Sequence, residues 1–303
     1  MEFTKIQGVG NDFIILNNMK LGLSADRFPY IAKKLCKRKT SIGADGLIIV
    51  DFPNGSSDFK MIFFNSDGSL GEMCGNGARC IARYAYINDI APKKMTFETT
   101  AGVVSAEILE NRQVKVKLNN PSIIRLNYNI EIDKIIYECS YVELGSPGTP
   151  HLVVKYPSLK ETEEAEIFQL GKFLRYYKEL PKGANVNFYD ILDENTVIVK
   201  TYERGVEDFT LACGTGSAST ALALQLKKCV KENYTKIVVP GGELFIEIEI
   251  KDETIQSLYL IGDTNIVAIG NVIDEDLIGK WKDVYIWLIQ REVFGIAIVS
   301  LSH

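Results

Sequence analysis

The chain has 303 residues, of which 46% are hydrophobic and 24% charged, and its formal net charge is −5. This composition is ordinary for a soluble globular protein, and the length allows two hydrophobic cores. No basic run with interleaved aromatic residues is present, so nucleic acid is not an expected partner.

The start of the chain and its cysteines point to the cytoplasm. Residues 1–6 have no basic start, apolar core or small-residue cleavage site of a secretory signal. The six cysteines do not form the dense framework of a small secreted protein, so we expect free thiols.

Strands dominate the predicted secondary structure. Runs of β-branched and aromatic residues predict strands, and two stretches of small and apolar residues predict helices that a sheet can cover closely. In chain order, the expected elements are strand 60–65, helix 78–86, strands 103–109 and 113–118, strand 196–202, helix 218–226 and strand 244–250.

Two short segments of the chain are near copies of each other. Residues 72–79 read EMCGNGAR, and residues 211–218 read LACGTGSA. Each segment places one cysteine directly before a Gly-x-Gly turn that opens a predicted helix, and these cysteines, Cys74 and Cys213, are 139 positions apart. Two such thiols suggest that the cysteines act together as a pair at one site.

Other landmarks repeat in the same order at nearly the same offset. The segment 43–46 reads GADG and 183–186 reads GANV, and Asn65 is matched by Arg204. Earlier in each half, Asn11 aligns with His151 or its neighbour. Order and offset together indicate an internal duplication.

The duplication predicts an α+β fold of two similar lobes, each with a central helix that a sheet covers closely, and an active site between the lobes. We expect residues 1–118 and 119–261 to form the lobes, with 262–275 returning to the first lobe. The extension 276–303 is apolar but is interrupted at 290–292 by Gln-Arg-Glu, which makes a membrane span costly. We therefore expect no membrane partner, and we expect this extension to pack on a lobe or on the second copy of a homodimer.

The position of the two thiols indicates acid–base chemistry. A cysteine at the start of a helix lies where backbone N–H groups favour negative charge, so we expect lowered thiol pKa values. If Cys74 and Cys213 face each other across a small molecule, one thiolate removes a proton from one face of a carbon and the opposite thiol returns a proton to the other face. Such a pair inverts a stereocentre.

Helix ends alone do not provide enough stabilisation for this reaction. A charge at a helix terminus is stabilised by up to about 2 kcal/mol, or roughly 1.5 units of pKa, whereas the α-proton of an amino acid is far less acidic than a thiol. Preorganised N–H donors must therefore stabilise the carboxylate as it becomes enediolate-like. The backbone N–H groups of Gly75, Asn76, Gly214 and Thr215 are the candidates, and the glycines allow the close approach.

The ordered motifs resemble those of the diaminopimelate epimerase family over residues 1–273. That resemblance implies an isomerase that needs neither pyridoxal phosphate nor another cofactor and interconverts LL- and meso-diaminopimelate in bacterial lysine and cell-wall biosynthesis. It also implies the fold of the lobes, each an antiparallel sheet wrapped around a central helix, with the active site in the cleft between them. The matching motifs are Gly8–Phe13, Gly43–Gly46, Phe64–Ser69, Met73–Cys80, Gly183–Phe188, Tyr202–Gly205, Ala212–Gly216 and Pro240–Gly242.

The same resemblance implies the roles of individual residues. Cys74 and Cys213 match the two catalytic bases, and Glu203 and His151 match auxiliary acid/base positions. The positions that hold the substrate correspond to Asn11, Asn65, Asn185 and Arg204, together with Thr149, which stands where the family commonly has asparagine. A guanidinium such as that of Arg204 suits a distal carboxylate.

Thr149 and the Gly262-Asp-Thr264 segment, which replaces the usual Gly-Pro-Ala, leave the substrate open to a related racemase activity, for example on histidine. A thiol hydrolase using Cys213 and His151 is the alternative of a different class. The two Gly-x-Gly turns lack the third glycine of a dinucleotide site and the lysine of a P-loop. Cysteine spacing and two histidines do not fit a zinc site, so no metal is expected.

The remaining cysteines have a simpler interpretation. A cysteine in an arbitrary sequence is more often a buried structural thiol than a catalyst. We apply that interpretation to Cys36, Cys80, Cys139 and Cys229.

Overall fold

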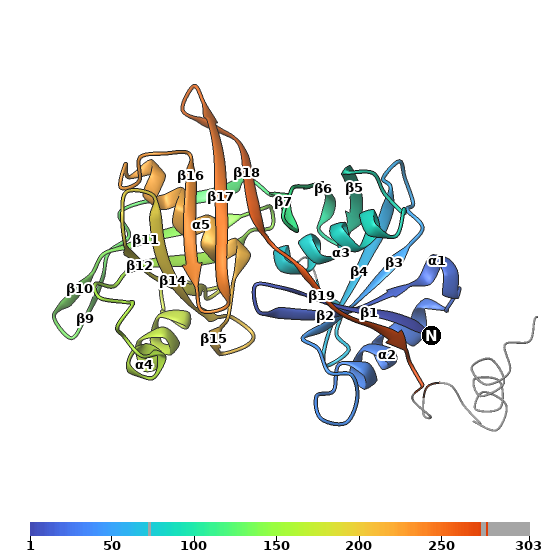
Figure 1. Cartoon of the computed structure of the whole chain (residues 1–303). Coiled ribbons are helices and arrows are strands. Elements are labelled where there is room, and N and C mark those ends of the chain that lie inside the picture. Colours follow the sequence, from blue (N-terminus) through green and yellow to red (C-terminus); the bar gives the residue numbers. More distant parts are fainter. Residues whose placement is uncertain (72–73, 274–276, 278–303) are drawn as a thin grey trace, which may run out of the picture.

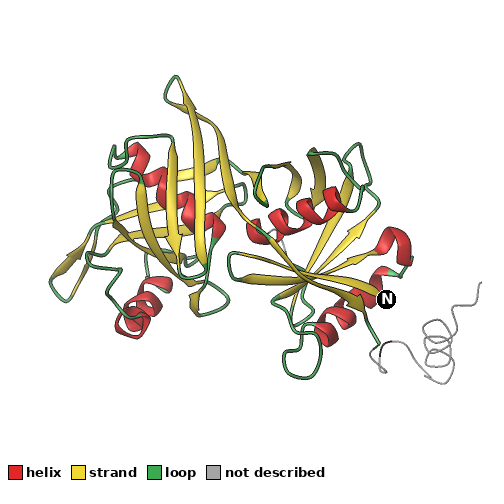
Figure 2. Ribbon diagram, viewed as in Figure 1, coloured by secondary structure: helices red, strands yellow, loops and turns green. Residues whose placement is uncertain are grey.

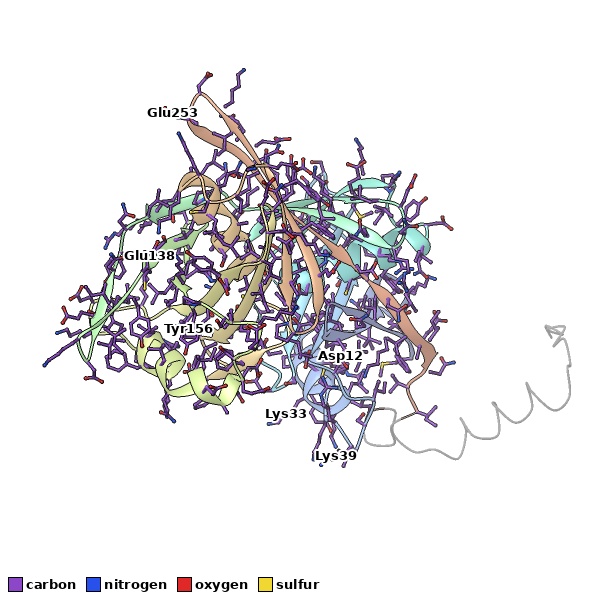
Figure 3. The ribbon with its side chains drawn as sticks, turned by 60° about the vertical axis from the view of Figure 1, so that its left-hand side comes forward. Asp12, Lys33, Lys39, Glu138, Tyr156 and Glu253 are labelled. Carbon is purple, nitrogen blue, oxygen red and sulfur yellow. The ribbon has the colours of Figure 1, made fainter. Side chains whose placement is uncertain are left out.

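The computed structural model of the chain describes residues 1–71, 74–273 and 277. These residues form two lobes that lie side by side, and the last strands run from the second lobe into the first (Figure 1). Strands predominate, and helices pack against the strands in both lobes (Figure 2). The turned view shows Glu253 at the tip of a hairpin that projects beyond both lobes (Figure 3).

The elements of the first half, in chain order, are β1 (Glu2–Gly8), β2 (Asn11–Asn17), α1 (Asn18–Leu21), a 3-10 turn (Ala25–Arg27), α2 (Phe28–Leu35), β3 (Gly46–Asp51), β4 (Phe59–Asn65), α3 (Gly75–Ile87), β5 (Lys94–Thr99), β6 (Gly102–Ile108), β7 (Gln113–Leu118) and β8 (Pro121–Arg125).

A small hairpin, β9 (Ile130–Ile132) and β10 (Ile135–Tyr137), leads into the second half. The elements that follow are β11 (Cys139–Leu144), β12 (Thr149–Lys155), α4 (Glu164–Arg175), β13 (Asn185–Ile191), β14 (Thr196–Glu203), β15 (Asp208–Thr210), α5 (Gly214–Leu226), β16 (Tyr234–Val239), β17 (Gly242–Lys251), β18 (Thr254–Asp263) and β19 (Asn265–Asn271).

The strands pair in the same order in both halves. In the first half, β1–β2 is antiparallel, β2–β3 parallel, β3–β4 antiparallel, β4–β5 parallel and β5–β6 antiparallel. The series β11, β12, β13, β14, β16 and β17 repeats this alternation. The expected α+β fold of two similar lobes is confirmed.

The sheets differ from the expected purely antiparallel form. Four of the pairs just described are parallel, and each is connected through helices: α1 and α2 join β2 to β3, α3 joins β4 to β5, α4 joins β12 to β13, and α5 lies between β14 and β16. Parallel neighbours require a crossover connection of this length. The hydrophobic pattern of a single strand does not show whether the strand pairs parallel or antiparallel with its neighbour.

Small side chains let the sheet close around each central helix. Ala78, Ala82 and Ala85 of α3 are fully buried, and so are Ala218 and Ala221 of α5. Helix α3 contacts β1, β2, β3, β6 and β7, and α5 contacts β11 to β14 and β16 to β18. Separate apolar clusters surround the two helices, so each lobe has its own core.

The two halves exchange their last strands. Strand β8 pairs with β11 of the second lobe, and β19 pairs with β1 of the first lobe. Strand β7 also pairs with β18. These three pairings join the lobes along their shared edge and fix the positions of α3 and α5 relative to each other.

Leu277 packs with the apolar side chains around α2. The rest of the predicted extension 276–303, and residues 274–275, lie outside the described residues. In the described ranges, no helix is both long and apolar enough to cross a membrane.

Candidate active site

The first turns of α3 and α5 meet at the junction of the lobes. Cys74 and Cys213 are the N-cap residues and have extended backbone, with φ of −110° and −116°. The helices therefore begin directly after the cysteines, at Gly75 and Gly214. This is a few residues earlier than the small-residue pattern predicts, because a pattern of buried side chains does not register glycine.

The glycines after the cysteines make this approach possible. A Cβ added to Gly214 would lie 2.6 Å from Cδ2 of Leu260 and 3.9 Å from Cα of Gly75. A Cβ added to Gly75 would lie 2.8 Å from the same Leu260 atom. Leu260 of β18 thus packs against both helix starts, and neither position has room for a side chain.

A cavity of about 730 Å³ opens where the two helix starts meet. Both cysteines line it, as do residues from both lobes, so the cavity belongs to the interface between them. The predicted site residues among its lining are Asn11, Asn65, Cys74, Gly75, Asn76, Glu203, Arg204, Cys213, Gly214 and Thr215.

The expectation of lowered thiol pKa values is wrong. Burial, and after it the Glu203 carboxylate, raise the pKa of Cys213 to about 12 against the opposing effect of the Gly216 N–H. That N–H donates to Cys213 Sγ at 3.4 Å, and Thr215 Oγ1 lies 3.7 Å from the same sulfur. Loss of hydration therefore outweighs the helix start.

Cys74 experiences the same balance of effects. Burial raises the pKa of its thiol, the Glu203 charge adds to this, and the nearby N–H groups of Gly77 and Asn76 act in the opposite direction. Both thiols are therefore protonated at neutral pH. A thiolate has to be generated by whatever charge enters the cavity.

Glu203, at the end of β14, lines the cavity and is the carboxylate whose charge acts on both thiols. Burial raises the pKa of Glu203 itself. A carboxyl group with a raised pKa, close to two thiols, is suited to exchanging protons with them.

His151 is not among the residues that line the cavity. It lies on β12 with no solvent exposure. Asn187 Nδ2 lies 3.3 Å from its Nδ1, and its Nε2 has no hydrogen-bond partner in the part of the chain that is described. Burial lowers the pKa of His151 to about 3, with a further contribution from the Arg204 charge.

Thr149 and Asn185 also lie outside the cavity lining. Thr149 pairs with Leu144 at the start of β12. Asn185 Oδ1 accepts a hydrogen bond of 2.8 Å from the backbone N–H of Arg204, and its Nδ2 donates to Pro150 O at 3.3 Å. Asn185 thus fixes the backbone that presents Arg204.

The side chains of Asn11 and Asn76 form a bridge between the lobes. Asn76 Nδ2 donates to Asn11 Oδ1 and, at 3.2 Å, to the carbonyl of Ala212 in the second lobe. Asn11 Nδ2 donates to Asp45 Oδ2 at 3.0 Å, and Arg38 Nη2 lies 2.8 Å from Asp45 Oδ1. A polar chain therefore runs from Arg38 to the residue before Cys213.

Asn65 and Arg204 occupy the exposed part of the cavity. Asn65 Nδ2 donates to Ser69 Oγ at 2.9 Å, and Arg204 Nη1 donates to the Lys182 carbonyl at 3.2 Å. These contacts hold an amide and a guanidinium at the entrance, the groups that a carboxylate-bearing ligand requires.

The sequence analysis gave no role to several lining residues, namely Phe13, Asp45, Phe63, Ser66, Asp67, Ser69, Gly205, Val206, Thr210 and Ala212. Of these, only Phe63, Val206 and Thr210 lie outside the ordered motifs. Asp45 had a signal, because it stands opposite Asn185 in the duplicated GADG and GANV segments. Among the described residues, no group of three or more histidine, cysteine, aspartate or glutamate side chains is placed to hold a metal ion.

Comparison with known proteins identifies the family. A family model described as diaminopimelate epimerase matches residues 3–124 and again residues 145–267. The chain belongs to the diaminopimelate epimerase family. The family predicted from the ordered motifs is confirmed, and the two matches reflect the duplicated lobes.

Curated relatives agree over most of the chain. A diaminopimelate epimerase of Aquifex aeolicus (strain VF5) is 39% identical over 292 residues, covering 91% of this chain and 99% of the relative. One from Hydrogenobaculum sp. (strain Y04AAS1) is 40% identical over 281 residues, covering 89% and 98%. The expected enzyme class, an isomerase, is confirmed for the family.

Solved structures share the fold at low sequence identity. A PhzF-family phenazine biosynthesis protein of Bacillus anthracis has a TM-score of 0.68 at 14% identity, covering 90% of this chain and 99% of its own. A probable proline racemase of Agrobacterium radiobacter K84 has a TM-score of 0.64 at 15% identity, covering 94% and 97%. These similarities support the two-lobed architecture.

Gly216→Ala tests how tightly the second helix start is packed. A Cβ there would lie 2.1 Å from Asn187 Oδ1 and 3.2 Å from Cys213 Sγ. Asn187 is buried and held by bonds to Thr201 and Leu152. We expect the free energy of unfolding, measured in urea, to fall by about 1–3 kcal/mol, although alanine normally stabilises a helix relative to glycine.

Gly77→Ala is the matched control at the equivalent position of α3. The nearest atoms outside its helix are the flexible ends of Ile48 and Met61, at 3.3 and 3.5 Å. The free energy of unfolding should change by less than about 1 kcal/mol. Equal losses in the two variants would contradict the packing described for α5.

The raised thiol pKa predicts slow alkylation of Cys213. Cys229 is exposed, so its interpretation as a buried thiol is wrong. In the folded protein at pH 8, iodoacetamide should modify Cys229 at least about a hundredfold faster than Cys213, because only the thiolate reacts. The Cys213 rate should still be rising at pH 10. Peptide mass spectrometry gives both rates, and urea-unfolded protein, in which they should converge, is the control. Equal alkylation rates of Cys229 and Cys213 at pH 8 in the folded protein would refute the raised pKa of Cys213.

Proposed function

We propose that this protein inverts the α-carbon of LL-diaminopimelate to give the meso isomer, with Cys74 and Cys213 as the two acid/base groups. The observation that carries the proposal is that both thiols line one cavity, at two helix starts that meet head to head. One thiolate removes the α-proton and the opposite thiol supplies a proton to the other face.

The substrate itself provides the charge that the site lacks. An α-ammonium about 4 Å from a thiolate stabilises it by about 4 kcal/mol at an effective dielectric constant near 20, which lowers the thiol pKa by about 3. Glu203, whose own pKa is raised by burial, is positioned to take the proton that the thiol releases. Thiol activation then accompanies binding, in agreement with the raised pKa of Cys213.

The helix starts supply the groups that stabilise the developing charge. The backbone N–H groups of Gly75, Asn76, Gly214 and Thr215 belong to the first turns of α3 and α5, where N–H groups have no partner within the helix. They are available to the reacting carboxylate as it gains enediolate character. Arg204 and Asn65, at the exposed part of the same cavity, are placed for the distal carboxylate.

The two departures from the family pattern lie outside the cavity lining. Thr149 is in the ladder with β11, and Asp263 pairs with Arg112 at 3.1 Å. Neither therefore argues for a different amino acid, and diaminopimelate is favoured over histidine. In lysine and peptidoglycan biosynthesis this step belongs in the cytoplasm, where the six free thiols remain reduced.

A thiol hydrolase is disfavoured by the state of His151. A Cys–His pair needs an imidazole that accepts the thiol proton. Burial lowers the pKa of His151 to about 3, and the residue is not part of the cavity lining. It is a poor base for Cys213.

The proposal is tested by incubating the protein separately with LL-diaminopimelate and L-histidine in deuterated water and following each α-proton by NMR. We expect exchange and inversion of diaminopimelate only. Exchange of histidine alone would assign the protein to a different racemase activity, and exchange of neither would refute the proposed reaction.

Cys74→Ala and Cys213→Ala should each lower kcat for inversion by about 10²- to 10⁴-fold, because each removes one of the two acid/base groups. Cys229→Ala, at an exposed thiol, is the control and should retain wild-type rates. An active Cys213→Ala variant would show that the two-base mechanism is wrong.

A further inference from the structure

Arg79 is a fully buried arginine one turn behind Cys74. It lies on α3 with no solvent exposure. Its Nη1 donates to Asn76 Oδ1 at 3.0 Å, while its Nε and Nη2 have no hydrogen-bond partner in the described part of the chain. Buried donors without partners lower stability, so fold stability does not explain this residue.

The surrounding backbone is shaped to hold the guanidinium. A Cβ added to Gly262 of β18 would lie 3.0 Å from Arg79 Nε, and one added to Gly8 of β1 would lie 3.3 Å from Nη2. Two glycines from different strands thus leave the space that this side chain fills. The cation is confined between β1, β18 and its own helix.

In the described part of the chain, few ionisable groups face Arg79. They are the thiols of Cys74 and Cys80 on α3 and the carboxylate of Asp263 at the end of β18. Asp263 is bound to Arg112 at 3.1 Å. Arg79 and, from the second lobe, Glu203 act on the pKa of the Cys74 thiol in opposite directions, Arg79 lowering it and Glu203 raising it.

Arg79 also determines how Asn76 is oriented. Because Arg79 donates to the oxygen of the Asn76 amide, the nitrogen of that amide points to Asn11 and to the Ala212 carbonyl. Ala212 directly precedes Cys213. A single hydrogen bond therefore connects the Asn76 side chain to the backbone next to Cys213.

The second lobe has no equivalent of this arginine. In the duplicated segments, the position of Arg79 is taken by Ala218, which is fully buried. In the part of the chain that the structure describes, the helix after Cys213 therefore has a buried alanine where the helix after Cys74 has an arginine.

We propose that Arg79 is a positioning residue of the epimerase site, which orients Asn76 across the lobe interface and places a buried positive charge behind Cys74. The inference rests on the proposed function for its kinetic consequences. Its consequence for the Cys74 thiol holds whichever amino acid is the substrate.

Arg79→Met replaces the cation with an apolar side chain of similar length. We expect kcat to fall by about ten- to a hundredfold with KM within threefold of wild type, because the lost interaction acts on the reacting groups. The midpoint of urea unfolding should be unchanged or higher, because two buried donors without partners are removed. If Arg79 had a purely structural role, Arg79→Met would instead lower the midpoint of urea unfolding and leave kcat unchanged.

The pH profiles of kcat/KM provide the signature of a charge behind one thiol. In the direction in which Cys74 is the base, the acidic limb should move to higher pH in Arg79→Met. In the reverse direction, in which Cys74 is the acid, the alkaline limb should move instead. Arg79→Lys keeps the charge and should restore both limbs towards wild type.

Arg83→Met is the matched control, because it removes the same charge one turn further along α3. Arg83 is not fully buried, and it donates to Thr264 Oγ1 at 3.2 Å. The Arg83→Met variant should leave the acidic and alkaline limbs of the kcat/KM profiles at their wild-type positions. Equal changes in the Arg79→Met and Arg83→Met variants, or wild-type kcat and limbs in Arg79→Met, would overturn the proposal.

Alkylation of Cys74 separates this inference from the proposed function. Without any substrate, the pH at which iodoacetamide modifies Cys74 should rise in Arg79→Met and not in Arg83→Met. If wild-type protein exchanges no α-proton but this rise occurs, the reaction is wrong and the role of Arg79 stands. If exchange occurs without the rise, the role of Arg79 fails alone.

Discussion

The close approach of two helix N-termini is the constraint on which the rest of the structure depends. Gly75 and Gly214 come near enough for a single leucine, Leu260, to pack against both. Each helix is covered by the strands of its own lobe, and the exchanged strands β8 and β19 join the lobes. Partly because of this exchange, N–H groups of both lobes reach one cavity, where unpaired helix ends favour anions.

This arrangement explains why the pKa values of both thiols are raised. The packing that brings the helix starts together also removes water from Cys74 and Cys213, and Glu203 adds a negative charge beside them. In the proposed reaction, the ammonium group of the amino acid would offset the Glu203 charge and so lower the pKa of the thiol beside it. Reactivity is then coupled to binding, which protects the thiols from unwanted chemistry when no substrate is present.

The sequence predicted the parts of the fold that are encoded locally or by repetition. The near copies around Cys74 and Cys213 predicted the two helices and the two-lobed class, and the period-2 patterns located strands such as β7. The parallel pairs and the exchange of β8 and β19 depend on contacts between distant segments, which no local pattern contains. The placement of His151 and Asn185 away from the cavity lining follows from the β12–β13 register, and only the structure provides that register.

Duplication has left the two halves of the site chemically different. After its cysteine, α3 carries Asn76, whose amide holds the second lobe at Ala212, whereas α5 carries Thr215, whose hydroxyl lies beside its own cysteine sulfur. One turn later, Arg79 in α3 corresponds to a buried alanine in α5. With diaminopimelate as the proposed substrate, the two sides of the reacting centre would also differ, because the distal centre is fixed while the reacting centre inverts. A pair of unlike thiols suits such a reaction, because each thiol would then meet a different side of the reacting carbon.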